Sequence, residues 1–380
     1  MRIACIASSR IPSRTANSIQ VMKVCQALVE LGHDVRLWVP GKAPAEAWEA
    51  LAEHYGLRRR VAVEWLGYIP PLRRYDFCLR ALRRARAWRP DLYYVWLLPA
   101  AALASRRGLP TLLEVHDRPT GRLGPRWLGM FMRGPGARRL LTVSEALRQW
   151  LEEQYRTPLR PPYAVVAPNG VDLERYADLP SPAEARRQLG LPERFTAGYT
   201  GHLYPGRGIG LLLDLARRNR DLSFVWAGGE PEAVRLWESR LRQASIENVT
   251  QLGFVPNERL PLIQAACDVL LMPYERRIAG SGGGDSAGSA SPMKAFEYLA
   301  AGRAILSSDL PVLREVLNEA NAVLLPPEDI ETWDQALKAL ASDEARRQAL
   351  AARARADAAR YSWTGREQQA LQGLEGSNGG

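Results

Sequence analysis

The chain has 380 residues, of which 46% are hydrophobic and 24% charged, a composition typical of a soluble globular protein. A single hydrophobic core stops growing at about 250 to 300 residues, so this length predicts two domains. The 51 basic and 41 acidic side chains give a net charge of +10, which favours phosphorylated ligands, anionic membrane surfaces or nucleic acid as partners. A general enrichment in arginine explains the same charge equally well.

The cysteines and the apolar runs exclude other classes. No Cys-x-x-Cys pair occurs, so neither a disulfide framework nor a zinc site is indicated. The first residues predict a strand rather than a secretory leader, and no apolar run approaches the ~18 residues that span a membrane. We therefore expect a cytoplasmic enzyme, with docking on the cytoplasmic face of a membrane left open.

In the first part of the chain, short apolar runs alternate with helical patterns. We expect a strand at 3–7, a helix at 18–31 and a strand at 35–39. This order predicts a parallel α/β sheet with right-handed crossovers. The loop after the first strand, SSRIPSRTANS, contains no glycine, which argues against a nicotinamide dinucleotide fold.

The helical pattern at 75–88 is amphipathic and strongly basic. Its apolar face consists of Phe77, Leu79, Leu82 and Trp88, and its basic residues are Arg80, Arg83, Arg84, Arg86 and Arg89. Such a helix can rest on anionic lipid. The commoner interpretation is a solvated helix on the outside of an α/β domain, and both stay open.

His116 follows a predicted strand at 111–115. Ligands of parallel sheets bind beyond the carboxyl ends of strands, which is where His116 would lie, although a lone histidine is more often structural. Further strands are expected at 92–96 and 140–144, with a helix from Ser144. We expect an irregular flap at 118–139 and the interdomain connection at 173–192.

The second half begins with a strand at 195–199, the turn TGHLYPGRG and a helix at 211–217. Small residues let the backbone approach an anion and Arg207 supplies a cation, so this turn predicts a phosphate-binding loop. We expect further strands at 224–229, 249–255, 265–272 and 322–325, and helices at 330–341 and 346–360.

A glycine-rich loop from Gly280 leads into Ser291, which we expect to cap a helix that has proline at its first position. The free N–H groups at that helix start form an anion site. Glu297 borders the buried face of the helix and should have a partner there. Gly302 is expected to end the helix before a buried strand at 304–308.

The run SPMKAFEYLAAGRAILSSDLPVLREVL resembles the donor-binding segment of GT-B glycosyltransferases of the retaining, glycogen-synthase-like class, called glycosyltransferase family 4. TGHLYPGRG, PNGVD and GFVP resemble the family as well, so the resemblance spans nearly the entire chain. It implies two Rossmann-like α/β domains facing each other across a cleft. The acceptor domain would comprise 1–175, joined by a C-terminal helix at 361–375, and the donor domain 190–360.

The resemblance also implies roles for single residues. Glu297 matches the glutamate that holds the ribose of the donor. Ser289 stands where the family has a second glutamate, which touches the transferred sugar, and Asp285 is a candidate replacement. Arg207 and Lys294 would stabilise the leaving diphosphate.

Further residues of the implied site lie elsewhere in the chain. His202 replaces a second diphosphate-binding cation, and His116 would hold a sugar hydroxyl. The remaining donor-side residues are Gly201, Phe254, Ser291 and Met293, and Asn17 lies on the acceptor side.

We therefore predict a glycosyltransferase that moves a sugar from a nucleoside-diphosphate sugar to a saccharide or lipid-linked acceptor, in polysaccharide, glycolipid or other glycoconjugate synthesis. Retention of configuration is implied by the resemblance alone. No Asp-x-Asp motif occurs, so we expect no metal and no cofactor. A sugar-nucleotide epimerase of the same architecture and a non-catalytic membrane-associated scaffold remain alternatives. Nucleic acid is not expected, because the arginines are not interleaved with stacking aromatics.

Overall fold

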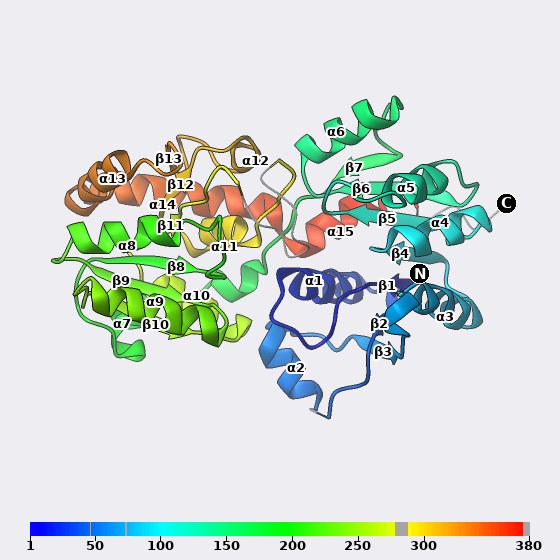
Figure 1. Cartoon of the computed structure of the whole chain (residues 1–380), viewed down its shortest axis with the longest axis horizontal. Helices are drawn as coiled ribbons and strands as arrows, with labels where there is room; N and C mark the ends of the chain where they lie inside the picture. The colour runs from blue at the N-terminus through cyan, green and yellow to red at the C-terminus, as the bar shows by residue number, and fades with distance from the viewer. Residues whose placement is uncertain (46, 73, 278–287, 375–380) are drawn as a thin grey trace. The chain divides into compact units, whose positions relative to one another are not determined.

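A computed structural model describes residues 1–45, 47–72, 74–277 and 288–374. The chain forms two compact units. The first comprises Met1–Asn169, Ser289–Ser291 and Trp363–Gly380, and the second comprises Gly170–Gly288 and Pro292–Ser362. Each unit is a parallel β-sheet covered by helices (Figure 1), which confirms the predicted fold class of two Rossmann-like α/β domains.

The first unit is built on a seven-stranded sheet of order β3-β2-β1-β4-β5-β6-β7, in which all neighbours are parallel. Its strands are β1 (Arg2–Ile6), β2 (Asp34–Pro40), β3 (Ala62–Leu66), β4 (Leu92–Val95), β5 (Thr111–Val115), β6 (Ala137–Thr142) and β7 (Ala164–Val166). The strand order reverses between β1 and β4. Crevices at such a reversal, beyond the carboxyl ends of the strands, are where open α/β sheets bind ligands.

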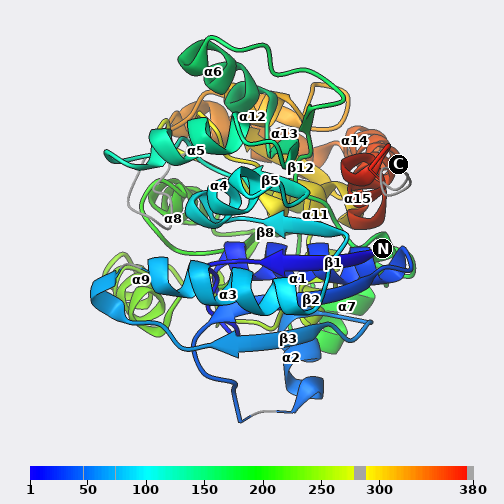
Figure 2. The same ribbon diagram turned by 90° about the vertical axis from the view of Figure 1, so that its right-hand side faces the viewer.

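The helices of the first unit are α1 (Ala16–Glu30), α2 (Trp48–Tyr55), η1 (Pro70–Leu72), α3 (Tyr75–Ala87), α4 (Leu98–Arg106), α5 (Gly124–Met132), α6 (Glu145–Tyr155) and α15 (Trp363–Leu371). A core of buried residues joins α3, α4 and α5 to one face of the sheet. Helices α1 and α15 pack against each other (Figure 2). Because side chains alternate along a strand, β5 contributes Leu113 and Val115 to that core and turns Glu114 to the opposite face.

The second unit has a six-stranded parallel sheet of order β10-β9-β8-β11-β12-β13. Its strands are β8 (Thr196–Thr200), β9 (Ser223–Ala227), β10 (Val249–Gly253), β11 (Val269–Met272), β12 (Ala304–Ser308) and β13 (Val323–Leu325). Its helices are η2 (Leu173–Tyr176), α7 (Pro182–Leu189), α8 (Ile209–Arg218), α9 (Pro231–Gln243), η3 (Asn257–Arg259), α10 (Leu260–Ala265), α11 (Met293–Ala301), α12 (Pro311–Arg314), α13 (Ile330–Ser342), α14 (Glu344–Ala358) and η4 (Ala359–Tyr361). Here the strand order reverses between β8 and β11.

The predicted flap at 118–139 is wrong, because most of it is α5 and the start of β6. Leu128 and Phe131 are fully buried in the core of the first unit, and this burial stabilises the helix despite its glycines. Gly134 permits close packing: a Cβ there would lie 2.2 Å from the Ser105 hydroxyl oxygen. Gly134 and Gly136 therefore serve tight contacts, since a Cβ at Gly136 would likewise lie 2.2 Å from the Leu109 carbonyl oxygen.

Two further expectations were also wrong in part. The stretch 173–192, expected to be the interdomain connection, contains the helices η2 and α7. Ser181 is the N-cap residue of α7, and its hydroxyl accepts a hydrogen bond from the Glu184 N–H. In α3, Phe77 and Leu82 are buried as expected, but the Leu79 side chain is 52% exposed. Leu79 lies away from the buried stripe, next to the arginines.

Candidate functional site

The predicted phosphate-binding loop lies at the strand-order reversal of the second unit. Residues 201–208 follow the carboxyl end of β8, and Tyr274 follows the carboxyl end of the neighbouring strand β11. Parallel strands bring these two segments to the same edge of the sheet. The loop and Tyr274 thus occupy the position at which doubly wound sheets bind ligands.

The helix predicted to start after Ser291 is α11, and its start differs from the prediction by one residue. Pro292 is the N-cap residue, with φ −70° and ψ 122°, and Met293 is the first helical residue. The Ser291 hydroxyl does not cap the helix, because it accepts a hydrogen bond from the Asn169 N–H at 3.0 Å within the first unit. The helix ends at Gly302 as predicted, in the left-handed conformation at φ 58°.

Lys294 lies in an aromatic cage with Arg207. The Lys294 Nζ atom is 3.9 Å from the ring centroid of Tyr199 and 5.2 Å from that of Tyr274. The Arg207 guanidinium carbon lies 4.8 Å from the Tyr274 centroid. We call these four residues the basic cage. Two cations therefore share one aromatic wall, an arrangement that favours a bound anion.

The Lys294 ammonium lacks a hydrogen-bond partner among the described residues. Its Nζ atom is shielded from solvent and forms no hydrogen bond with any residue that the structure describes. Burial lowers the pKa of Lys294 well below its ordinary value and the charge of Arg207 lowers it further, while the charge of Glu297 acts in the opposite direction. A buried cation without a hydrogen-bond partner is costly, and an anionic group beside it would lower that cost.

Gly201 leaves the space that the Lys294 ammonium occupies. The glycine has φ 143°, and a Cβ atom at this position would lie 2.6 Å from Nζ. Gly208, the last residue of the loop, has φ 69°, and a Cβ atom there would lie 1.7 Å from the Pro273 carbonyl oxygen. Both glycines are thus required by the backbone conformation and by close contacts.

The other predicted donor-side residues lie around this loop or outside the described chain. His202 stacks on Tyr204 with ring centroids 4.6 Å apart, and its carbonyl accepts a hydrogen bond from the Tyr199 hydroxyl at 2.6 Å. Phe254 directly follows β10 and is half-buried, as is Met293. Asp285 lies outside the described residues.

Ser289 lies in the first unit, close to Asp117. Its side chain is buried, and its hydroxyl donates a hydrogen bond to Asp117 Oδ1 at 3.3 Å. Its carbonyl accepts a hydrogen bond from the Ser144 hydroxyl at 3.0 Å. A carboxylate from another part of the chain therefore stands beside the position where the family has a glutamate.

His116 directly follows the carboxyl end of β5, as predicted, and its Nε2 atom lies 2.7 Å from Glu114 Oε1. Asn17 lies in the first turn of α1, where its side-chain oxygen accepts a hydrogen bond from the Ser9 hydroxyl. Both residues belong to the first unit, near the carboxyl ends of β5 and β1 respectively.

Several side chains of these sites were missed at the sequence level: Tyr199, Tyr274, Glu114, Asp117 and Arg366. Tyr274 had a detectable signal, since it directly follows the buried run VLLMP at the end of a strand. Arg366 had none, because its contact with Glu114 joins residues separated by 252 positions.

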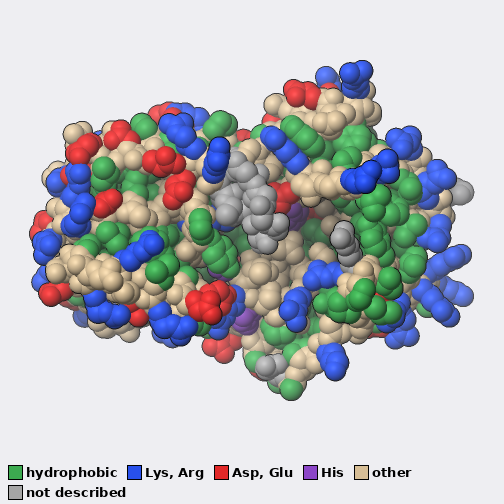
Figure 3. Space-filling model, in the orientation of Figure 1, with side chains coloured by type: hydrophobic (Ala, Val, Ile, Leu, Met, Phe, Trp, Pro, Cys, Tyr) green, Lys and Arg blue, Asp and Glu red, His purple; other side chains and the backbone are tan. Residues whose placement is uncertain are grey.

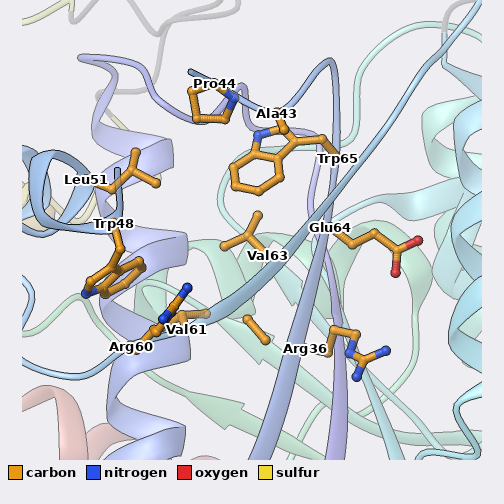
Figure 4. A pocket seen from close by; sticks show the side chains of 11 residues that line it. Arg36, Ala43, Pro44, Trp48, Leu51, Arg60, Val61, Val63, Glu64 and Trp65 are labelled. Carbon is orange, nitrogen blue, oxygen red and sulfur yellow. The ribbon is translucent and has the colours of Figure 1, made fainter. Parts of the chain in front are cut away.

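A further pocket lies at the edge of the first sheet and contains no predicted site residue. It is lined by residues of α2 and β3, among them Trp48, Leu51, Val63 and Trp65 (Figure 4). The Trp65 indole N–H is already satisfied, because it donates to the Ile11 carbonyl at 2.7 Å.

The described residues contain neither a membrane-spanning helix nor a cluster of metal-binding side chains. In the described part of the chain, no helix is both long and apolar enough to cross a membrane. No group of three or more His, Cys, Asp or Glu side chains within the same residues is placed to hold a metal ion. Cys5, Cys25, Cys78 and Cys267 are buried and free of disulfides.

Comparisons with known proteins bear on both units. The chain is 26% identical over 247 residues to 2-deoxystreptamine glucosyltransferase of Streptomyces kanamyceticus, covering 58% of this chain and 62% of that protein. It is 30% identical over 210 residues to D-inositol 3-phosphate glycosyltransferase of Xylanimonas cellulosilytica, covering 52% and 48%. The aligned segments thus span about half the length of these relatives.

Among solved structures, Anabaena HepE in complex with UDP has a TM-score of 0.77 at 18% identity, over 98% of this chain and 99% of that chain. This likeness concerns the fold. Residues 18–175 match the family described as Glycosyltransferase Family 4, and residues 182–357 match the family described as Glycosyl transferases group 1. Because these two matches together take in most of the chain, it belongs to the GT-B glycosyltransferases of the family 4 type.

Proposed function

We propose that this chain transfers a sugar from a nucleoside-diphosphate sugar to a hydroxyl group of an acceptor. The observation that carries the proposal is the buried Lys294 ammonium, which has no hydrogen-bond partner among the described residues and shares the basic cage with Arg207. A diphosphate supplies several negatively charged acceptor oxygens, which is what two adjacent cations require. HepE was solved in complex with UDP, which supports a uridine nucleotide as the first ligand to test.

In the proposed reaction, the bond between the anomeric carbon and the phosphate oxygen breaks and its electron pair stays on the leaving diphosphate. The acceptor oxygen forms the new bond to the anomeric carbon, and its proton passes to a phosphate oxygen or to solvent. Arg207, Lys294 and the N–H groups at the start of α11 would stabilise the charge that develops on the leaving group. Glu297 would hold the ribose and so orient the anomeric carbon.

The remaining predicted roles belong to the same proposal. His116 would bind a saccharide hydroxyl, and Asn17 would lie on the acceptor side. Asp285 is the predicted replacement for the glutamate that Ser289 lacks. Asp117, which hydrogen-bonds to Ser289, is a second candidate that the structure adds. Retention of configuration and independence of metal ions rest on the family resemblance and on the missing Asp-x-Asp motif. The acceptor is proposed to be a saccharide or a lipid-linked saccharide.

Binding of nucleoside diphosphates tests the proposal directly. We expect UDP or another nucleoside diphosphate to raise the thermal unfolding temperature of the wild type, since ligand at ~100 times its Kd stabilises by about 2.7 kcal/mol. Lys294→Ala should lose most of this shift. Lys338→Ala is the matched control, because Lys338 makes a surface ion pair with Asp334 at 2.8 Å, on α13. A panel of nucleoside diphosphates that leaves the wild type unshifted would refute the proposal.

Acceptor dependence separates transfer from the epimerase alternative. A transferase releases free nucleoside diphosphate in proportion to the acceptor hydroxyl that is consumed, whereas an epimerase converts the donor sugar without any acceptor. Incubation of the donor alone, followed by analysis of the sugar, therefore distinguishes these two activities.

We also propose that the first unit contacts anionic membranes peripherally, which would place the protein on the cytoplasmic membrane face. Ile69, Leu72 and Leu79 are 46%, 47% and 52% exposed, and the η1 segment is held to α3 by a hydrogen bond from the Ile69 N–H to Asp76. The arginines of α3 are exposed beside them. Basic and hydrophobic side chains also intermingle on the visible face of this unit (Figure 3). Such a mixture suits an anionic lipid surface.

Vesicle flotation tests the membrane contact. The wild type should float with anionic phosphatidylglycerol vesicles and not with neutral phosphatidylcholine vesicles. The double variant Arg83→Glu/Arg86→Glu should lose flotation, whereas Arg235→Glu/Arg242→Glu, which changes exposed arginines of α9, should keep it. Equal flotation with both lipids would contradict the proposal.

A further inference from the structure

Glu114 is a buried carboxylate at the centre of a hydrogen-bond network in the first unit. It is 1% exposed. Its Oε1 atom accepts hydrogen bonds from Gln20 Nε2 at 2.7 Å and from Arg366 Nη2 at 2.6 Å, and it lies 2.7 Å from His116 Nε2. Its Oε2 atom accepts from the Tyr94 hydroxyl. Side chains from α1, β4 and α15 and from the loop after β5 therefore converge on one carboxylate of β5.

Arg366 keeps Glu114 ionised. Burial by itself would raise the pKa of the Glu114 carboxyl, but the charge of Arg366 and the hydrogen bonds from His116 and Tyr94 outweigh it and lower that pKa to about 2. Arg366 is anchored in turn, because its Nε donates to the Pro168 carbonyl at 2.9 Å and its Nη2 to the Ala167 carbonyl at 3.1 Å. Its Nη1 atom also pairs with Glu367. At neutral pH, Glu114 can therefore only accept hydrogen bonds.

This ionisation state determines which nitrogen of His116 carries the proton. A carboxylate has no proton to donate, so the Nε2 atom facing it must be the N–H donor. In the neutral ring the Nδ1 atom is then unprotonated and available as an acceptor. The His116 side chain is 24% exposed, so the ring is accessible to a ligand. Asp117, the other nearby carboxylate, hydrogen-bonds to Ser289.

We propose that Glu114, held in place by Arg366, is a positioning residue that fixes His116 as the Nε2–H tautomer and presents Nδ1 to a substrate hydroxyl as a hydrogen-bond acceptor. The part of this inference that concerns substrate rests on the proposed function; the tautomer does not. Its consequence is a preference for a sugar that carries a free hydroxyl at the contacted carbon. A deoxy or O-methyl analogue has no proton to donate there.

The His116 tautomer is measured directly by ¹⁵N NMR of the histidine side chains. The chain has only four histidines, and the His116→Gln variant assigns the signal of interest. For the neutral ring, recorded at a pH above which its nitrogen signals no longer change, we expect a protonated Nε2 and an unprotonated Nδ1 in the wild type. A signal showing a protonated Nδ1 would overturn the proposal, and this result needs no variant and no active enzyme.

Two variants separate positioning from mere structural support. Glu114→Leu removes the acceptor oxygen that faces Nε2, so we expect the Nδ1–H tautomer to appear and kcat/KM to fall by about 10- to 100-fold. Tyr94→Phe removes another hydrogen bond to the same carboxylate and should keep the wild-type tautomer. An unchanged tautomer in Glu114→Leu would contradict the inference.

Donor binding distinguishes a failure of this inference from a failure of the proposed function. The basic cage lies in the second unit, so Glu114→Leu should bind UDP as tightly as the wild type in calorimetry. If the wild type binds no nucleoside diphosphate but shows the Nε2–H tautomer, the proposed function fails and the assigned tautomer stands. If UDP binds and the wild-type ring carries its proton on Nδ1, the inference fails alone.

Discussion

Replacing Glu367 by glutamine should make the protein less sensitive to alkaline pH. Burial raises the pKa of the Glu367 carboxyl, Arg366 acts in the opposite direction and the charge of Glu114 adds to the increase, so that the pKa is raised to about 7. The folded state therefore favours the protonated acid more strongly than the unfolded chain does, whose ordinary value is 4.5. This contribution to stability is present at acidic pH and is lost as the pH rises from about 4.5 through about 7.

The size of the effect follows from the two pKa values. At about 1.36 kcal/mol per pKa unit the full contribution is on the order of 3 kcal/mol, and about 2.5 kcal/mol of it is lost between about pH 5 and pH 8.5. Glutamine cannot ionise but can still accept a hydrogen bond from Arg366. Relative to wild type, the Glu367→Gln variant should therefore gain about 2 to 3 kcal/mol in unfolding free energy over that range.

Urea denaturation of both proteins at the two pH values measures this difference, and any loss of packing that does not depend on pH cancels. Glu184→Gln serves as the control, because hydrogen bonds from Gln188 and Arg187 lower the pKa of that carboxyl, so it should not show the gain. If wild type and Glu367→Gln change in parallel between the two pH values, the buried acid is not protonated in the folded state and the reasoning is refuted.

The remaining predictions concern the basic cage and its loop. Gly208→Ala should lower the unfolding free energy, measured by urea denaturation, by about 2 to 4 kcal/mol. The reason is that Gly208 has φ 69° and the new Cβ atom would lie 1.7 Å from the Pro273 carbonyl oxygen. Gly210→Ala is the control, because its Cβ atom would meet nothing within 4 Å, and it should be neutral or stabilising. Lys294→Met should raise the thermal unfolding temperature of the ligand-free protein, because it removes a buried cation. The same variant should bind UDP at least about tenfold more weakly in calorimetry. An unchanged affinity for UDP would show that Lys294 is not part of the binding site. Gly201→Ala should weaken the same binding, because its Cβ would displace the ammonium of Lys294. Turnover should survive excess EDTA, and activity that requires added Mg²⁺ would contradict the expected independence of metal ions.

Local patterns were sufficient for the fold class and for much of the donor-side loop. The buried strands of both sheets are nearly continuous apolar runs between helical patterns, and a parallel α/β fold is the architecture that such an order produces. The end of α11 at Gly302 was also predictable from a local feature. A helix that ends in the left-handed conformation needs a residue that tolerates positive φ, and glycine does. The turn containing Arg207 was recognisable from its glycines and its cation.

Patterns that depend on distant contacts were misread. The glycines of 118–139 suggested an irregular flap, yet Leu128 and Phe131 bury the face of a regular helix there. Ser291 has the residue type and the following proline that are typical of a helix N-cap, but its hydroxyl accepts a hydrogen bond from the Asn169 N–H instead. Leu79 had the spacing of a buried residue but lies beyond the reach of the core.

The sequence by itself determined most of the strands and helices, though not α5, because hydrophobic period, glycine and proline act over a few residues. Tertiary structure alone decided which charges meet. Lys294 and Arg207 share a cage because neighbouring parallel strands carry their loops to one edge. Glu114 and Arg366 pair because α15 packs beside α1 in the first unit. The charge state of a buried group depends on such neighbours, so the proton on His116 and that on Glu367 follow from the folded arrangement and from no local motif.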